Sequence, residues 1–184
     1  MVEIERKWLV ARDGVLPEEC RALLAQHGEE GHSRIEQGYF YNSARGNAIR
    51  LRKTTSGDQV GCFITVKSAG HSSNMVRQEY ENEVCGEVFD ALWPLTEGRR
   101  IQKTRYHIPL GANTVELDVY KGVWSGLVIA EIEFDSEVEA VMFKAPRWLG
   151  TEVTGDTQYS NHNLAIAKSE PTSGSANKTS KQRK

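Results

Sequence analysis

The amino-acid sequence predicts a mainly β protein of the α+β class, in which an antiparallel sheet is joined by a few short helices. Two observations lead to this prediction. Short segments in which charged and aliphatic side chains alternate recur from the N-terminus to Phe134, and glycines separate many of them. Because successive side chains of a strand point to opposite faces, each such segment would have one charged face and one apolar face.

The N-terminal segment shows this alternation first, in the order Glu3, Ile4, Glu5, Arg6, Lys7. In an extended strand Glu3, Glu5 and Lys7 share one face. Two carboxylates on one strand can share a divalent cation, and the neighbouring ammonium can meet a phosphate that the cation holds. This pattern alone is also typical of a strand face in water, so it gains weight only through its recurrence.

Further segments repeat the same division, and their polar faces combine basic and acidic residues. The side chains concerned are Arg50 and Arg52, then Lys67, then Arg77, Glu79 and Glu81, then Lys103, Arg105 and His107, then Glu116 and Asp118, and finally Glu131 and Glu133.

Two arrangements fit these faces. In the first, an antiparallel sheet packs its apolar face on a core and leaves its charged face in water. In the second, the sheet closes into a barrel with the charges inside and the aliphatic face outside, covered by helices. The frequent arginines favour the second, because arginine suits bidentate contacts with phosphate. The Glu-x-Glu pairs favour it as well, because such closely spaced acids repel one another unless a cation is present.

Four short helices are predicted between and after these strands. The first begins near Pro17, has Glu18 and Glu19 in its first turn and ends before Gly28. The expected helical ranges are 16–27, 87–93, 137–143 and 163–168.

Composition restricts the classes of function. The 184 residues have a formal net charge of only −2, which does not favour binding to nucleic acid. No apolar run is long enough to cross a membrane, and the charged N-terminus is unlike a signal peptide. We therefore expect a cytoplasmic protein, with Cys20, Cys62 and Cys85 as reduced thiols. One domain is expected over residues 1–168, followed by a disordered basic tail over residues 169–184.

The charged segments, in their order, resemble the CYTH family of triphosphate tunnel metalloenzymes. The resemblance rests on Glu3-Ile4-Glu5-Arg6-Lys7, Gln37-Gly38-Tyr39, Arg50-Leu51-Arg52, Thr65-Val66-Lys67, Arg77-Gln78-Glu79-Tyr80-Glu81, Lys103-Thr104-Arg105-Tyr106, Glu116-Leu117-Asp118 and Glu131-Ile132-Glu133. Residues 148–154 resemble the short single-domain bacterial branch, which is inorganic triphosphatase-like. The resemblance implies a closed eight-stranded antiparallel β-barrel, the triphosphate tunnel, with helices packed outside.

The resemblance also implies an activity, namely metal-dependent hydrolysis of a triphosphate with Mg²⁺ or Mn²⁺ as cofactor. Most simply, inorganic tripolyphosphate would be split into pyrophosphate and phosphate. The metal would be held by Glu3, Glu5, Glu131 and Glu133. The phosphates would be bound by Lys7, Arg50, Arg52, Lys67, Arg77, Lys103 and Arg105. Lys7, Lys67 and Tyr39 would take part in catalysis, and the supporting acids would be Glu79, Glu81, Glu116 and Asp118.

Other functions stay open at this point: a thiamine triphosphatase, a class IV-type adenylate cyclase, or a non-enzymatic polyphosphate-binding module. The polar faces carry few aromatic residues on which a base or thiamine could stack, namely Tyr39, Phe63 and Tyr120. We therefore expect an inorganic triphosphate as the small-molecule partner, and neither nucleic acid nor a membrane. A homodimer is one alternative for the oligomeric state.

Overall fold

A computed structural model describes residues 2–27, 32–40, 48–67 and 76–167, except for the side chains of residues 2, 67 and 76–78. The expected basic tail, residues 169–184, lies outside this part of the chain. The fold is mainly β, as predicted. Its strands are β1 (Val2–Ala11), β2 (His32–Tyr39), β3 (Ala48–Ser56), β4 (Gln59–Lys67), β5 (Val76–Glu83), β6 (Arg100–Leu110), β7 (Asn113–Tyr120), β8 (Val128–Glu133) and β9 (Thr151–Glu152).

The helices are short and lie close to their predicted positions. They are α1 (Glu18–His27), α2 (Gly86–Leu92), α3 (Glu137–Met142) and α4 (Asn161–Ile166), with 3₁₀ turns η1 (Trp93–Thr96), η2 (Gly122–Trp124), η3 (Arg147–Leu149) and η4 (Thr157–Tyr159). Helix α4 begins earlier than expected because Ser160 caps it, its side chain accepting a hydrogen bond from the Asn163 amide. Of the helices in the described ranges, none has the length and apolar character needed to cross a membrane.

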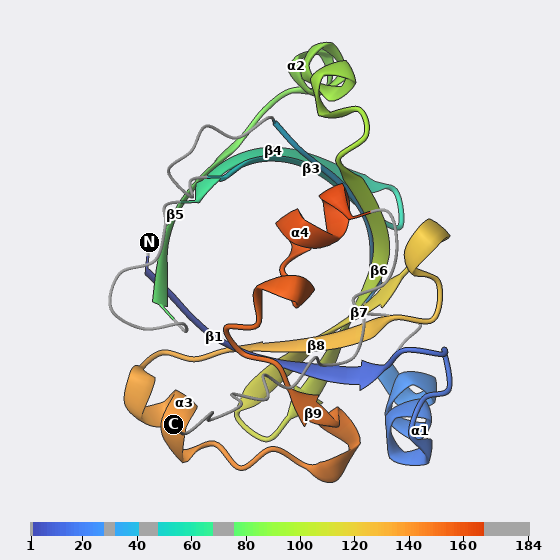
Figure 1. Ribbon diagram of the computed structural model, residues 1–184, viewed down its shortest axis with the longest axis vertical. Helices are drawn as coiled ribbons and strands as arrows, with labels where there is room; N and C mark the ends of the chain where they lie inside the picture. Colours follow the sequence, from blue (N-terminus) through green and yellow to red (C-terminus); the bar gives the residue numbers. More distant parts are fainter. Residues whose placement is uncertain (1, 28–31, 41–47, 68–75, 168–184) are drawn as a thin grey trace, which may run out of the picture.

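The strands form one antiparallel sheet in the order β5-β4-β3-β2-β6-β7-β8-β1-β9. The sheet curls so far that its strands surround a central space, with α4 projected onto that space in the view of Figure 1. Within the described residues, strand β1 also pairs with β5 through Val2, Glu3 and Ile4.

The predicted closed eight-stranded barrel is therefore wrong in two respects: the sheet has nine strands and is not closed. The reason is found on β1. Its residues Glu5–Ala11 pair with β8 on one side, while Trp8 and Leu9 pair with β9 on the other. Strand β9 thus takes part of the β1 edge along which β5 would have to pair for the sheet to close.

The larger hydrophobic cluster lies outside the curled sheet. Trp8, Leu117 and Ile132 point outward and pack with Cys20 of α1 and Trp148 of η3. A second cluster lies on the inner face, where Tyr39 and Tyr120 are the register partners of Arg50 and Lys103 and pack with Trp124 and with Leu164 of α4. The inner face also carries the charges, and several of them are buried: Lys103 is 2% exposed, Asp118 0% and Glu131 6%. The alternative of a charged face in water is therefore wrong.

Candidate active site

Strand register brings the charged residues together. Across β1 and β8, Glu5 pairs with Glu133 and Lys7 with Glu131. Across β7 and β8, Glu116 pairs with Glu131. Residues that face each other in an antiparallel pair lie on the same face of the sheet, so these alternating charges all enter the interior.

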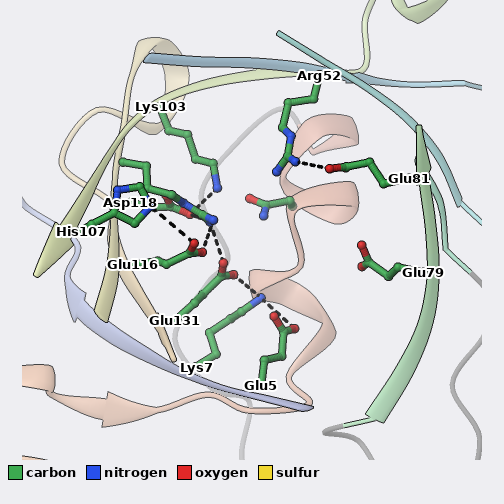
Figure 2. Close-up of polar contacts among 12 residues, drawn as sticks. Glu5, Lys7, Arg52, Glu79, Glu81, Lys103, His107, Glu116, Asp118 and Glu131 are labelled. Atoms are coloured by element: carbon green, nitrogen blue, oxygen red, sulfur yellow. Dashed lines mark hydrogen bonds and ion pairs between the residues drawn. The ribbon is translucent and has the colours of Figure 1, made fainter. Parts of the chain in front are cut away.

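There they surround a cavity of about 560 Å³, here called the central cavity. Its lining residues come from six strands: Glu3, Glu5, Arg50, Arg52, Glu79, Tyr80, Glu81, Asn82, Arg105, Glu116, Glu131 and Glu133. Figure 2 shows Lys7, Arg52, Lys103 and Glu131 converging on this interior from different strands. Of the residues expected to form the site, the structure thus brings together those on β1, β3, β5, β6, β7 and β8.

One side of the cavity is a dense ion-pair network around Arg105. Its guanidinium donates to both carboxylate oxygens of Asp118, at 2.7 and 2.8 Å, and at 2.8 Å to Glu131. Arg105 also pairs with Glu116, and Lys103 pairs with Asp118. Burial lowers the pKa of Lys103 to about 8, with a further contribution from the positive charge of Arg105. Both oxygens of Asp118 are thus engaged by basic side chains, which holds these cations in place.

Lys7 lies beside this network, with its ammonium 2.7 Å from Glu131 and 3.8 Å from Glu5. Burial alone would raise the pKa of Glu131. The positive charges of Lys7 and Arg105 outweigh burial and hold this pKa well below its usual value. Glu131 therefore remains a carboxylate in the interior.

The other side of the cavity is formed by Arg50 and Arg52. Their guanidiniums donate to the two oxygens of Glu81, at 3.0 and 2.8 Å. Arg50 also donates to the Thr65 hydroxyl at 3.1 Å. The Nε–H groups of both arginines are buried, and within the described residues they have no hydrogen-bond acceptor. These donors can therefore bind an anion that enters the cavity.

The carboxylates in the acidic part of the cavity repel one another. Burial raises the pKa of Glu133, and the negative charges of Glu116, Glu3 and Glu5 raise it further. Among the described residues, no three acidic, histidine or cysteine side chains form a ready-made metal-binding group. The donor set nevertheless fits a hard divalent cation, because its ligands are carboxylate oxygens and a cation would relieve their repulsion.

Two expected site residues have no described side chain, and a third, Tyr39, lies on the inner face as the register partner of Arg50. The side chains of Lys67 and Arg77 are outside the described part of the structure. Tyr39 is buried within the second core cluster, where its hydroxyl accepts a hydrogen bond from the Gln37 amide at 2.9 Å. Burial raises the pKa of Tyr39 to about 12. The phenol is therefore held in its neutral form over the ordinary pH range.

Sequence reasoning gave no site role to Thr65 and Gln37, although each contacts an expected site residue. Alternation along the strand was a usable signal for both, since Thr65 lies two residues from Lys67 and Gln37 two residues from Tyr39. His107, which shares the polar face of Lys103 and Arg105, lines an adjacent cavity of about 360 Å³ and lies 3.6 Å from Glu116.

Comparison with known proteins agrees with this geometry. A protein described as an inorganic triphosphatase from Nitrosomonas europaea is 41% identical over 169 residues, which are 91% of this chain and 99% of that protein. An inorganic triphosphatase from Acetivibrio thermocellus is 36% identical over 163 residues, 88% of this chain and 92% of that protein.

Solved structures share the fold. A crystal structure of an inorganic triphosphatase is 37% identical and superposes with a TM-score of 0.61, covering 91% of this chain and 96% of that one. A Pyrococcus horikoshii protein is 22% identical, with a TM-score of 0.56 and coverage of 81% and 90%, and so shows the fold alone. The family model for the CYTH domain matches residues 1–163. The resemblance noted in the sequence is thereby confirmed, and the chain belongs to the CYTH domain family.

Proposed function

We propose that the protein is a divalent-metal-dependent inorganic triphosphatase that hydrolyses tripolyphosphate to pyrophosphate and phosphate. The observation that carries this proposal is the central cavity itself, in which buried guanidiniums on one side face repelling carboxylates on the other. Such a cavity can hold a polyanion and a cation together. The inorganic triphosphatase names of two relatives support the same substrate.

The phosphate chain would be bound by Arg50, Arg52 and Arg105, with Lys7 and Lys103 nearby. Charge-assisted hydrogen bonds from arginine are strong, and burial strengthens them because water does not compete for the donors. The Nε–H groups of Arg50 and Arg52 are shielded from water, and in the described structure they have no hydrogen-bond acceptor. Phosphate oxygens would satisfy them, so these arginines favour the bound state.

The metal would be held by Glu131, Glu133, Glu5 and Glu3, whose carboxylates line the same cavity. Mg²⁺ and Mn²⁺ both prefer such oxygen ligands. When bound, the ion would neutralise charge on the phosphates and polarise the phosphorus–oxygen bond that breaks. Glu131 would connect the metal ligands with the cations that bind phosphate, since Lys7 and Arg105 already contact it.

The chain's own contribution to the reaction is positioning and charge. A water oxygen would attack a terminal phosphorus and pass its proton to a phosphate oxygen, while the bond to the bridging oxygen breaks and pyrophosphate leaves with the electron pair of that bond. Lys7 and Arg105 would stabilise the negative charge that grows on these oxygens. Lys67 and Tyr39 stay candidates for a catalytic contribution, with Tyr39 acting as a neutral hydroxyl.

The test is release of phosphate from tripolyphosphate with Mg²⁺, with Mn²⁺ and with EDTA. We expect turnover with one or both metals and none with EDTA. Glu131→Gln should reduce kcat by roughly 100-fold or more, because it removes the negative charge that would bind the metal and that holds Lys7 and Arg105 in place. Arg34→Ala serves as the control, because Arg34 lies exposed on β2 and does not line the cavity.

A different result would separate catalysis from binding. Tight binding of tripolyphosphate without turnover under any metal condition would contradict the proposed enzyme and favour a polyphosphate-binding module. Turnover by Glu131→Gln equal to that of the unmodified protein would show that the metal and the chemistry lie elsewhere.

A further inference from the structure

The segment from Arg147 to Asp156, here called the strap, has no role in the chemistry proposed above. It comprises η3, β9 and the turn that follows, and it carries the residues 148–154 that stand out in the sequence. In Figure 1 it lies beside β1, near α1 and α3. Its backbone contacts with β1 include Lys7, one of the cations of the site.

The strap is fixed to the outer core and pressed against β1. Trp148 and Leu149 are buried in the same cluster as Trp8. Gly150 follows with φ of 81°, and a Cβ atom there would lie 2.4 Å from the Leu9 carbonyl oxygen. Only glycine permits this conformation and this close approach. The strap is therefore held at a fixed distance from β1.

Beyond Gly150 the strap contacts the backbone of Lys7 directly. The amide of Lys7 donates to the Thr154 hydroxyl oxygen at 3.0 Å, and the Val153 amide donates to the Lys7 carbonyl at 2.8 Å. On the opposite edge of β1, Lys7 pairs with Glu131 of β8. The peptide groups of Lys7 are thus fixed from both sides.

The Thr154 hydroxyl is itself oriented by a charged pair. It donates to Glu152 at 2.7 Å. Glu152 in turn accepts two hydrogen bonds from the Arg6 guanidinium, at 2.9 and 2.6 Å. The Lys7 carbonyl oxygen is a second, more distant acceptor at 3.5 Å. When the hydroxyl proton is directed to the nearer Glu152, the oxygen lone pairs face the Lys7 amide. This orientation makes Thr154 an acceptor at the point where β1 enters the site.

The strap also lies directly behind the functional side chains. A hollow of about 10 Å³ is lined by Glu5 and Lys7 on one side and by Thr154, Asp156 and Ser160 on the other. That is room for about one water molecule. Little free space therefore separates the strap from the charged face of β1. A movement of the strap would shift the side chains of Glu5 and Lys7.

We propose that Thr154 is a positioning residue for the triphosphate site, acting through Lys7. This inference rests on the proposed function, in which the Lys7 ammonium contacts phosphate. Thr154 fixes the backbone from which that ammonium projects, and the Glu152–Arg6 pair fixes Thr154. A substitution that removes the hydroxyl leaves the Lys7 amide without its acceptor and lets the ammonium leave its place beside Glu131.

The experiment compares Thr154→Val, which removes the hydroxyl at nearly constant shape, with Thr154→Ser, which keeps it. Binding of tripolyphosphate is measured by calorimetry without metal, and kcat and KM are measured with metal. We expect Thr154→Val to weaken binding by about fivefold to tenfold, within the range for loss of one part-buried hydrogen bond. Thr154→Ser should restore most of this loss. Thr151→Val is the matched control, since Thr151 lies exposed in the same strap.

A double-mutant cycle with Lys7→Ala tests whether the effect passes through Lys7. If it does, Thr154→Val causes no further loss of binding when Lys7 is already alanine. An equal loss in both backgrounds would show a general structural effect and overturn the proposal, as would equal binding by Thr154→Val and the unmodified protein. Because binding is measured without turnover, a chain that binds tripolyphosphate but does not hydrolyse it would refute the proposed enzyme while the cycle still decides the role of Thr154.

Discussion

Single residues of the central cavity have opposite energetic roles. Asp118 and Glu131 are carboxylates surrounded by cations and stabilise the interior. Glu133 is surrounded by other acids, and both burial and their negative charges raise its pKa. At neutral pH without metal, such a residue destabilises the fold. The protein retains it, we infer, because the site needs its charge when a cation is bound.

This difference leads to a prediction for Glu133→Gln. Without metal, in EDTA, the variant should melt at a temperature higher by roughly 1–2 °C, as a few tenths of a kcal/mol would give in a chain of this size. Added Mg²⁺ or Mn²⁺ should raise the melting temperature of the unmodified protein more than that of the variant, and turnover of the variant should fall. Calorimetric melting curves check this. Equal metal-induced shifts in both proteins would place the metal away from Glu133.

Arg52 should contribute to binding more than to turnover. Arg52→Ala removes one charged hydrogen-bond donor to the phosphate chain, which should cost about 1–3 kcal/mol of binding free energy. We expect a raised KM for tripolyphosphate and a kcat within a few-fold of the unmodified value. Steady-state kinetics provide the measurement, with Arg34→Ala on the outer face as the control. A large fall in kcat at unchanged KM would assign Arg52 to the chemical step instead.

Among the elements, the strap covers part of the edge of β1 and stabilises it through the Arg6–Glu152 pair. Hydrogen bonds from the Arg6 guanidinium lower the pKa of Glu152, with a smaller contribution from the Thr154 hydroxyl. A carboxyl group with a lowered pKa in the folded state stabilises the fold above its unfolded value of 4.5. This stabilisation disappears as the pH falls below 4.5 and through the folded pKa.

Glu152→Gln should therefore lower the free energy of unfolding at pH 7, and the difference from the unmodified protein should shrink steadily as the pH falls below about 4.5. Urea unfolding at a series of pH values between 3 and 7 measures this difference. Thr151→Val controls for disturbance of β9. A destabilisation by Glu152→Gln that stays the same across this pH range would show that the Arg6–Glu152 pair does not stabilise through charge.

The elements also show what the sequence could and could not predict. Alternation of charged and aliphatic residues identified the long strands and the charged interior, because period-two patterning reports directly which face is buried. The strap was missed as an element because β9 has only two residues and no alternation. Closure into a barrel was expected from the charged faces and from the family resemblance, and β9 occupies part of the β1 edge that closure would need. Tyr39 was expected in the catalytic group; it lies on the inner face as the register partner of Arg50, but its ring is buried in the second core cluster.

For the whole molecule, the curled sheet has its larger hydrophobic cluster outside, while its inner face carries the charges and, beside α4, the second apolar cluster. Helices α1 and α3 and the turn η3 provide apolar cover for the outer face. This arrangement is costly unless every charge has a partner, and in the described structure most charges of the interior do. A polyanion with its cation would add further partners for the Arg50 and Arg52 donors and for the acidic side.

The same architecture bears on substrate choice. Tyr39 and Tyr120 are buried in the second core cluster and do not line the central cavity. Tyr80 borders the cavity, but it alternates on β5 with the inward-pointing Glu79 and Glu81 and is 60% exposed. Phe63 lies under the Arg52 guanidinium, 5.5 Å from it, in the adjacent cavity. Most of the binding free energy should therefore come from the phosphates, and an organic substituent should add little or obstruct.

The most direct test of the central claim is the comparison of kcat/KM for tripolyphosphate, ATP and thiamine triphosphate with the same metal, together with an assay for cyclic AMP. We predict that tripolyphosphate exceeds both organic triphosphates by at least roughly tenfold, which needs only about 1.4 kcal/mol of discrimination. Pyrophosphate and phosphate should appear in equal amounts. A preference for thiamine triphosphate, or appreciable formation of cyclic AMP, would contradict the inorganic triphosphatase.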